Sequence, residues 1–349
     1  LAPWDLDGAP AFPEERVDYG PVIQFRQRLP RISFAHFRAT ADDGQKADLA
    51  AFVRDHAAWL NDYALFAALK DHHRGAAWGQ WERDIATRQP DAVERWRREL
   101  DGQIQFQQYV QFLFEKQWSA LKAYANERGV SIIGDIPIFV AYDSADAWAN
   151  GKLFRFDADG APTHVAGVPP DAFSPTGQLW GNPLYDWEAM AEDGYAWWIA
   201  RFRRTLQAVD VIRLDHFRGF DACWEVPAGD ATAENGQWVK TPGRELFGAL
   251  QQALGPVRII AEDLGVITPE VDAMREEEGF PGMKVLQFAF GGDANHQYLP
   301  HTYEHDCVVY TGTHDNDTTL GWFDTLGEEE RDAVCRYLGG RCEEINWEL

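Results

Sequence analysis

The stretch Val209-Asp-Val-Ile-Arg-Leu-Asp-His-Phe-Arg-Gly219 decides how the rest of the chain is interpreted. Its apolar, β-branched start is typical of a strand, and alternate residues of a strand point to the same face. Arg213 and Asp215 therefore share a face at the end of the expected strand. The arginine favours the ionised form of the carboxyl group, and an ionised carboxylate at a strand end can act as a nucleophile. Taken alone, the segment is equally consistent with an ordinary ion pair.

Four further apolar runs predict strands, which are expected to be buried and parallel; they lie at 130–140, 256–262, 283–288 and 307–311. Helical patterns alternate with the strands, at about 188–207, at 243–254 and from Thr268-Pro269 onward. This alternation indicates an α/β fold, either a TIM (β/α)8-type barrel or an open doubly wound sheet. No Gly-x-Gly-x-x-Gly follows an early strand, so the barrel is preferred. It would be incomplete, because only five strands are visible.

The chain divides into a predicted helical region and a predicted catalytic barrel portion. The helical region, 1–128, begins with a loop over about the first 20 residues and has helices at about 46–74, from Pro90 and at about 104–128. The barrel portion, 129–349, contains a Gly-, Pro-, Asp- and aromatic-rich insertion at about 141–187. A loop of this length is usually functional or disordered, and its Trp and Phe content argues for an ordered loop over a site.

Composition excludes several classes of partner. The formal net charge of −24 argues against nucleic acid and against an anionic membrane surface. No secretion signal or membrane-spanning apolar run is visible. The four cysteines form no Cys-x-x-Cys pair, which fits a reduced, cytoplasmic compartment. The 15 tryptophans suit either a core or sugar rings, and composition does not separate these uses.

Three of the expected strands end in carboxylates, Asp215, Glu262 and Asp315. Parallel strands of a barrel deliver their C-terminal ends to one mouth, so the three acids should converge. A retaining glycosidase or transglycosidase needs an ionised nucleophile and a protonated acid about 5 to 5.5 Å apart. Arg213 should keep Asp215 charged, whereas the apolar residues before Glu262 should raise its pKa. Asp315 with His314 could hold substrate hydroxyls.

A metal site is the competing interpretation, because Asp, Glu and His also bind cations. His301 and His305 have the spacing of a His-Glu-x-x-His motif, but Thr302 occupies the position of its glutamate. We therefore expect no metal.

With these residues identified, the chain resembles the amylomaltase-type 4-α-glucanotransferases of the α-amylase superfamily. The resemblance is dense from about residue 129 to 323 and weaker before it. Its motifs are Gly134-Asp-Ile-Pro-Ile-Phe-Val-Ala, Gly167-Val-Pro-Pro-Asp, Gly177-Gln-Leu-Trp-Gly-Asn-Pro, Arg213-Leu-Asp-His-Phe-Arg-Gly, Ala261-Glu-Asp-Leu-Gly and Thr311-Gly-Thr-His-Asp-Asn-Asp.

The resemblance implies a transferase that moves α-1,4-glucan segments to the 4-hydroxyl of an acceptor through a covalent glycosyl-aspartate. By motif position Asp215 would be the nucleophile, Glu262 the acid/base and Asp315 the transition-state stabiliser. The implied substrate-binding residues are Arg213, His314, Asp135, Asp171, Gln178 and Trp180. The implied partners are α-1,4-glucans and maltooligosaccharides, and no cofactor is needed.

The chain also departs from this family. The family's first two barrel strands, an active-site tyrosine after them, and its last strand have no counterpart, so the chain should hold about strands 3 to 7. We expect a fragment that is unstable or inactive alone, because an unclosed barrel exposes two strand edges. A retaining α-glucan hydrolase and a catalytically silent glucan-binding protein remain as alternatives. Oligomeric state and preferred glucan length are not predicted.

Overall fold

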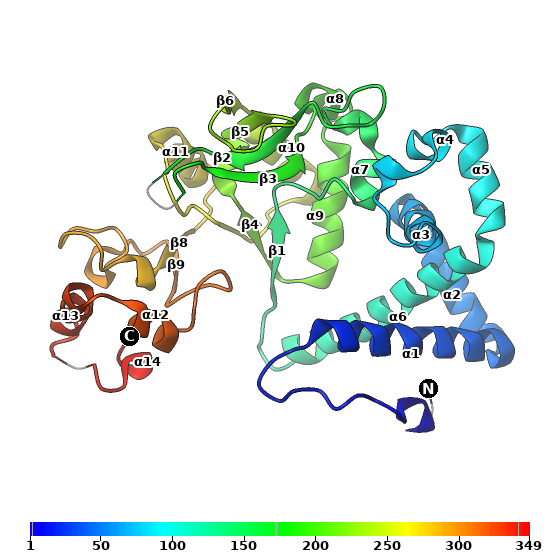
Figure 1. The fold of residues 1–349 in the computed structure, drawn as a ribbon, viewed down its shortest axis with the longest axis horizontal. Coiled ribbons are helices and arrows are strands. Elements are labelled where there is room, and N and C mark those ends of the chain that lie inside the picture. The colour runs from blue at the N-terminus through cyan, green and yellow to red at the C-terminus, as the bar shows by residue number, and fades with distance from the viewer. Residues whose placement is uncertain (2, 172–173, 341) are drawn as a thin grey trace.

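The computed structural model describes residues 1, 3–171, 174–340 and 342–349. A helical region, blue and cyan in Figure 1, lies beside a part in which strands and helices alternate. Within the described residues, no helix is both long and apolar enough to cross a lipid bilayer.

The helical region comprises α1 (Tyr19–Thr40), α2 (Asp43–Asp55), α3 (Ala57–His72), α4 (Arg83–Ala86), α5 (Pro90–Glu99) and α6 (Asp101–Asn126). The predicted helix at 46–74 is two helices, divided at His56, while those from Pro90 and at 104–128 are confirmed as α5 and α6. Helix α1 and the short η1 (Pro3–Leu6) were not predicted. Pro30 lies inside α1, and a proline within an apolar pattern indicates the end of a helix rather than its interior.

All five predicted strands are present. Strands β1 (Ile133–Pro137), β4 (Val211–Asp215) and β7 (Ile259–Ala261) form a parallel sheet in the order β1-β4-β7, and β8 (Gly282–Val285) pairs in parallel with β9 (Cys307–Tyr310). The α/β arrangement is therefore confirmed, but these five strands form two separate parallel sheets and do not close a barrel in the described part of the chain.

The expectation that all five strands are buried is wrong for β1 and β9. Ile133 is 51% exposed and Val309 is 44% exposed, whereas β4, β7 and β8 contain mostly buried residues. Strands β7 and β8 also end their sheets, but they adjoin each other, because the Ala261 N–H donates to the Pro281 carbonyl at 2.9 Å. Strands β1 and β9 have no such neighbour on their outer side in the described part of the chain, which explains their exposure.

The insertion predicted as a loop at 141–187 contains strands. Strands β2 (His164–Val168) and β3 (Gln178–Pro183) join β5 (Ala222–Pro227) and β6 (Gln237–Lys240) in an antiparallel sheet of order β3-β2-β5-β6. A Cβ at Gly167 would lie 2.5 Å from the carbonyl oxygen of Gln178, so this strand requires glycine. Glycine within a strand is easily mistaken for a loop signal.

The remaining helices are α7 (Ala145–Ala149), α8 (Trp187–Glu192), α9 (Ala196–Ala208), α10 (Gly243–Leu254), α11 (Pro269–Glu277), α12 (Thr319–Thr325), α13 (Glu328–Tyr337) and α14 (Ile345–Glu348). The predicted helix at 188–207 is thus divided into α8 and α9, while α10 and the start of α11 at Pro269 are confirmed.

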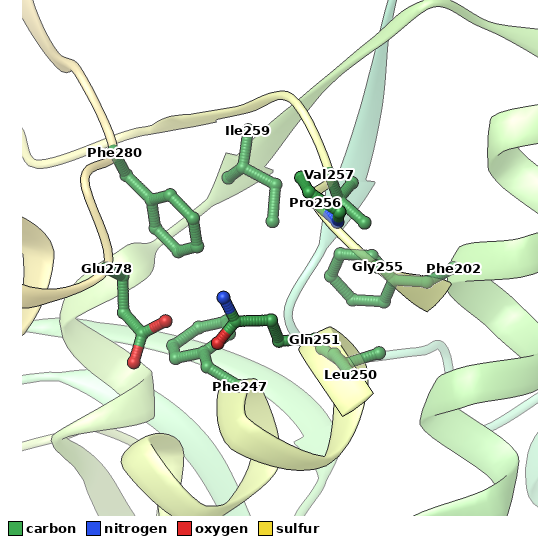
Figure 2. Close-up of a pocket in the computed structure, with 10 residues that line it drawn as sticks. All are labelled: Phe202, Phe247, Leu250, Gln251, Gly255, Pro256, Val257, Ile259, Glu278 and Phe280. Atoms are coloured by element: carbon green, nitrogen blue, oxygen red, sulfur yellow. The ribbon is translucent and has the colours of Figure 1, made fainter. Parts of the chain in front are cut away.

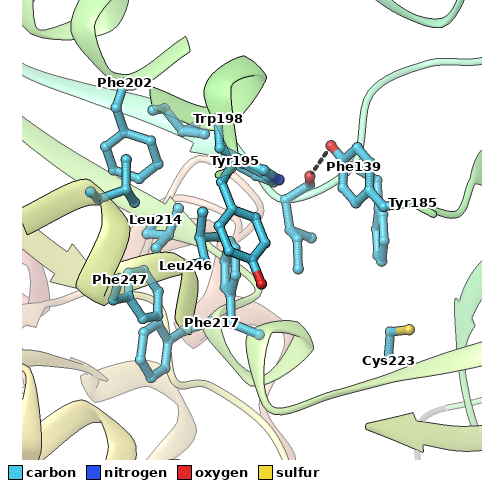
Figure 3. Close-up of a cluster of buried hydrophobic side chains, with 14 of the residues drawn as sticks. Phe139, Tyr185, Tyr195, Trp198, Phe202, Leu214, Phe217, Cys223, Leu246 and Phe247 are labelled. Carbon is cyan, nitrogen blue, oxygen red and sulfur yellow. Dashed lines mark hydrogen bonds between the residues drawn. The ribbon is translucent and has the colours of Figure 1, made fainter. Parts of the chain in front are cut away.

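The main core lies where α9 and α10 cover the parallel sheet, and Figure 3 shows its aromatic side chains. Trp198 and Phe220 pack edge to face with ring centroids 5.5 Å apart, and the rings of Phe217 and Phe247 stack at 5.7 Å. A second core in the helical region buries Trp78, Trp81, Trp96 and Trp148. Many of the tryptophans therefore serve as packing rather than as sugar contacts.

Two cysteines depart from the expectation of a reduced chain. Cys335, near the end of α13, forms a disulfide with Cys342, and their Cα atoms are 5.5 Å apart. Gly339 and Gly340 both have positive φ, a conformation that glycine adopts readily, and they turn the chain back toward the helix.

Candidate active site

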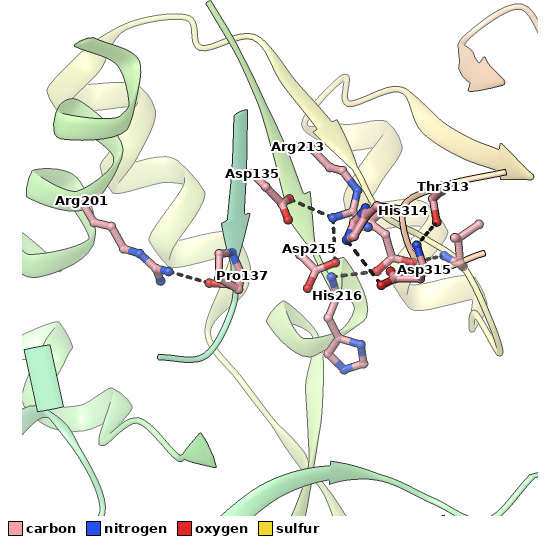
Figure 4. A network of polar contacts seen from close by, with 11 residues as sticks. Asp135, Pro137, Arg201, Arg213, Asp215, His216, Thr313, His314 and Asp315 are labelled. Carbon is pink, nitrogen blue, oxygen red and sulfur yellow. Dashed lines mark hydrogen bonds and ion pairs between the residues drawn. The ribbon is translucent and has the colours of Figure 1, made fainter. Parts of the chain in front are cut away.

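Strand register brings an arginine between two aspartates. Asp135 of β1 lies directly opposite Arg213 of β4, and Asp215 is two residues further along β4 on the same face. The Arg213 NH1 atom is 2.8 Å from Asp135 Oδ1 and 2.9 Å from Asp215 Oδ1. Figure 4 shows the guanidinium group joining both carboxylates. The predicted neighbours Arg213 and Asp215 are therefore in contact, and Asp135 joins them.

The next strand places Glu262 beside Asp215. Leu214 of β4 pairs with Ala261 of β7. The next residues, Asp215 and Glu262, therefore lie side by side at the ends of neighbouring strands. Two backbone N–H groups hold the Glu262 carboxyl: His216 donates to Oε2 at 2.8 Å and Leu264 donates to Oε1 at 2.9 Å. The position of this side chain is thus fixed by the main chain on both sides.

The electrostatic surroundings of Glu262 and Asp215 both favour the neutral acid. Burial raises the pKa of Glu262 to about 7, even though two backbone hydrogen bonds oppose the rise, so the predicted raised pKa is confirmed. Burial also raises the pKa of Asp215 above its usual value. Arg213 lowers that pKa, as predicted, but burial outweighs the arginine, an effect that the sequence did not indicate.

Asp315 and His314 lie in the loop that follows β9. The side chains of these two residues are exposed, with His314 Nε2 3.4 Å from Asp315 Oδ1, and the negative charge of Asp315 contributes to the raised pKa of Asp215. The Thr313 N–H donates to Asn316 Oδ1 at 2.8 Å, which closes the turn around them. Figure 4 shows Asp315 on the side of Arg213 and Asp215. The predicted convergence of three strand-end carboxylates is therefore present.

The predicted loop residues lie in and before β3. Trp180 packs edge to face on His216 with ring centroids 4.8 Å apart, and its Nε1 donates to Gln178 Oε1 at 3.1 Å. Through Trp180, these two residues of β3 contact His216, the residue next to Asp215. Asp171 lies in the connection between β2 and β3, where its Oδ1 accepts the Ser174 N–H at 2.7 Å.

The backbone of His216 was not identified from the sequence. His216 has φ 53° and ψ 54°, in the left-handed region that β-branched and bulky residues avoid, and this turn directs its N–H to Glu262. The ring is buried, and burial lowers the pKa of His216 to about 4. The only sequence signal was its place directly after Asp215.

Asp263, directly after Glu262, was missed as well. It is buried, accepts the Met283 N–H at 2.7 Å and lies 3.3 Å from Arg275 Nε. This residue ties the end of β7 to β8 and α11.

The competing metal interpretation gains no support from His301. Its Nδ1 lies 3.0 Å from the Tyr337 hydroxyl and its Nε2 lies 2.7 Å from the Ala294 carbonyl oxygen, so both ring nitrogens have protein partners. In the described residues, no three His, Cys, Asp or Glu side chains are grouped to hold a metal ion.

Comparison with known proteins agrees with this site. The family model described as 4-alpha-glucanotransferase matches residues 5–349. The chain belongs to the 4-alpha-glucanotransferase family. A 4-alpha-glucanotransferase of Synechocystis sp. is 51% identical over all of this chain, and that of Thermus thermophilus is 47% identical over 97% of it. Family membership confirms the predicted enzyme class.

A solved 4-alpha-glucanotransferase structure also has this fold. The amylomaltase from Streptococcus agalactiae, in complex with acarbose, has a TM-score of 0.89 and 37% identity over 94% of this chain. The chain spans 70% of the Synechocystis and Thermus relatives and 66% of the streptococcal chain.

Proposed function

We propose that the three carboxylates carry out 4-α-glucanotransfer by a retaining double displacement, with Asp215 as nucleophile, Glu262 as general acid/base and Asp315 as stabiliser of the transition state. One observation carries these roles: Glu262, held by two backbone N–H groups, has a pKa of about 7, beside an aspartate that is paired with Arg213. An acid that is half protonated near neutral pH can both donate and accept a proton.

In the first step an Asp215 oxygen attacks the anomeric carbon of an α-1,4-glucan. The bond from that carbon to the glycosidic oxygen breaks, and the proton of Glu262 moves to the leaving 4-oxygen. In the second step an acceptor 4-hydroxyl attacks the same carbon, Glu262 takes its proton, and the Asp215 ester breaks. Two inversions restore the α configuration.

The surrounding residues bind substrate in this proposal. Asp135 and His314 lie at either side of the Arg213–Asp215 pair and would accept or donate hydrogen bonds to sugar hydroxyls. Gln178 and Trp180 of β3, together with Asp171, would cover the glucan. We also infer that the five parallel strands are consecutive strands of an eight-stranded (β/α) barrel, and that 1–128 is a helical region attached to it.

Incubation of the full-length enzyme with maltotriose tests the transfer reaction. A transferase yields glucose and longer oligosaccharides while the total number of reducing ends stays constant. A retaining hydrolase, the runner-up function with the same carboxylates, raises the number of reducing ends because water is the acceptor. A steady rise in reducing ends would reject the transfer proposal.

The variant Asp215→Asn tests the nucleophile and separates an enzyme from a silent glucan-binding protein. It should remove nearly all turnover, because the amide is a far weaker nucleophile, while circular dichroism and thermal unfolding remain those of a folded protein. Turnover that persists in Asp215→Asn would reject Asp215 as the nucleophile, and absence of turnover from the unmodified full-length protein would support the binding-protein alternative.

A further inference from the structure

A cavity of about 320 Å³ lies between α3, α7 and α9, and none of the three catalytic carboxylates lines it. Another cavity, of about 130 Å³, is walled largely by core side chains such as Phe202, Phe247 and Phe280 (Figure 2). The larger one, called here the α3–α7–α9 cavity, has a volume within the range of small-molecule sites and a mixed lining of rings and polar groups.

Aromatic rings line two walls of the α3–α7–α9 cavity. Trp59 and Tyr63 of α3 have ring centroids 6.1 Å apart, and Trp197 of α9 faces the cavity from another wall. All three rings are partly exposed rather than sealed in a core. The C–H face of a pyranose ring is flat and apolar, so partly exposed indole and phenol rings provide surfaces on which sugar units can stack.

The charged groups of the cavity already have protein partners. Arg204 NH2 lies 2.6 Å from Glu115 Oε2, Arg201 NH2 donates to the Pro137 carbonyl at 2.7 Å, and Asp62 lies 2.9 Å from Arg88. The guanidinium of Arg201 also lies over the Trp197 ring, 5.3 Å from its centroid. The lining holds two aspartates, Asp62 and Asp146, and two arginines, Arg201 and Arg204, so its formal charges balance and the cavity suits a neutral ligand better than a phosphate or a carboxylate.

Polar groups beside the rings can bind hydroxyls. Asp146 is exposed and accepts the Trp197 Nε1–H at 3.2 Å, which leaves further lone pairs on its carboxylate. Asn150 and Thr205 line the same cavity. Carboxylate, amide and hydroxyl groups beside aromatic rings are the combination that a polyhydroxylated, uncharged ring requires.

The cavity is also connected to the strand that carries Asp135. The Pro137 carbonyl that accepts from Arg201 lies two residues beyond Asp135 on β1, and Figure 4 shows this contact beside the catalytic residues. A ligand held in the cavity would therefore lie near the C-terminal end of β1.

From these contacts we propose that the α3–α7–α9 cavity binds a short segment of a neutral α-1,4-glucan outside the catalytic site and anchors long glucans to the enzyme. The identity of the sugar as glucose rests on the proposed function. The rings and the balanced charges of the cavity favour an uncharged sugar whether or not that function is correct.

Affinity electrophoresis in gels that contain glycogen tests binding without turnover, in an Asp215→Asn background. Ala200 is exposed on α9 and lines the cavity, so Ala200→Gln should fill it without removing any packing. We expect Ala200→Gln and Trp59→Ala each to weaken the interaction with glycogen about two- to tenfold, the loss expected for one aromatic contact. Ala123→Gln, at an exposed position of α6 outside the cavity, is the matched control and should change nothing.

Kinetics of the active enzyme distinguish the anchor from a change in the catalytic site. Ala200→Gln should raise KM for glycogen by the same factor and leave kcat/KM for maltotriose unchanged, because maltotriose reacts at the catalytic carboxylates and none of these lines the cavity. Retention in glycogen gels that is unaffected by Ala200→Gln, or an equal loss with both substrates, would overturn the proposal. A complete lack of turnover by the unmodified full-length enzyme would instead reject the proposed function, and the gel comparison would still decide the cavity.

Discussion

At the scale of single residues, the paired carboxyls Asp215 and Glu262 set the pH dependence. Glu262 must be protonated to donate, so activity should fall as the pH rises through its pKa of about 7. Asp215 must be ionised to attack, and its raised pKa moves the acidic limb above that of an ordinary aspartate. We therefore predict a narrow bell-shaped profile of kcat/KM, measured with maltotriose.

Glu262→Gln is the control for that profile. The amide cannot donate or accept the proton, so turnover should drop about 10²- to 10⁴-fold. The alkaline limb of the pH profile should disappear. An alkaline limb that persists in Glu262→Gln would assign that limb to another group.

The left-handed backbone of His216 gives a second prediction at this scale. Its N–H holds Glu262 only while the turn keeps φ near 53°. A β-branched residue resists this conformation, so His216→Val should cost about 1–3 kcal/mol of stability and shift the alkaline limb as Glu262 loses its partner. Asparagine tolerates the left-handed region, so His216→Asn should retain the limb. Identical pH profiles for the two variants would contradict the positioning role.

At the scale of elements, the sequence predicted where the strands lie and which carboxylates follow them. It did not predict which residues of neighbouring strands are in contact. Apolar β-branched runs identified β4 and β7, and the parallel arrangement alone was enough to expect Asp215 and Glu262 at one end. Their exact neighbours depend on register, such as Leu214 opposite Ala261, which no local pattern encodes. The raised pKa of Asp215 was not predicted for a similar reason, because burial is a property of the folded molecule.

The antiparallel sheet β3-β2-β5-β6 was missed at the same scale. Its strands are short and include Gly167, where the chains approach too closely for a side chain. A pattern that looks like a loop can therefore be a strand that pairs with distant residues. Helix α1 was missed because Pro30 interrupts its pattern, and a proline usually marks the end of a helix.

The junction between β7 and β8 carries a prediction about stability. Asp263 and Arg275 form a buried ion pair, and burial raises the pKa of Asp263 while the arginine lowers it. Arg275→Met leaves the carboxylate buried without that partner and should cost about 3–5 kcal/mol in urea unfolding. The double variant Asp263→Asn/Arg275→Met removes both charges and should recover part of the loss. An additive double variant would mean that the two side chains do not interact.

For the molecule as a whole, the two sheets leave strand edges open. Within the described residues, β1 and β9 each pair on one side only, and both carry exposed apolar side chains, Ile133 and Val309. Open edges of this kind pair with other chains. The relatives are longer than this chain, which spans 70% of the first two, so their additional residues have the opportunity to cover such edges.

The open edges predict that the isolated 349-residue chain self-associates and has little activity. Sedimentation velocity should detect the association, and Ile133→Lys or Val309→Lys should reduce it, because a charge on an edge strand opposes pairing. Val266→Lys is the matched control: Val266 is 75% exposed, more than either strand residue, but lies outside every strand, so its replacement should not change association. An equal effect of Val266→Lys would assign the association to exposed apolar surface in general. A monomeric, fully active 349-residue chain would contradict the prediction, since it would mean that the open edges of β1 and β9 neither attract partners nor disturb the carboxylates at the ends of these sheets.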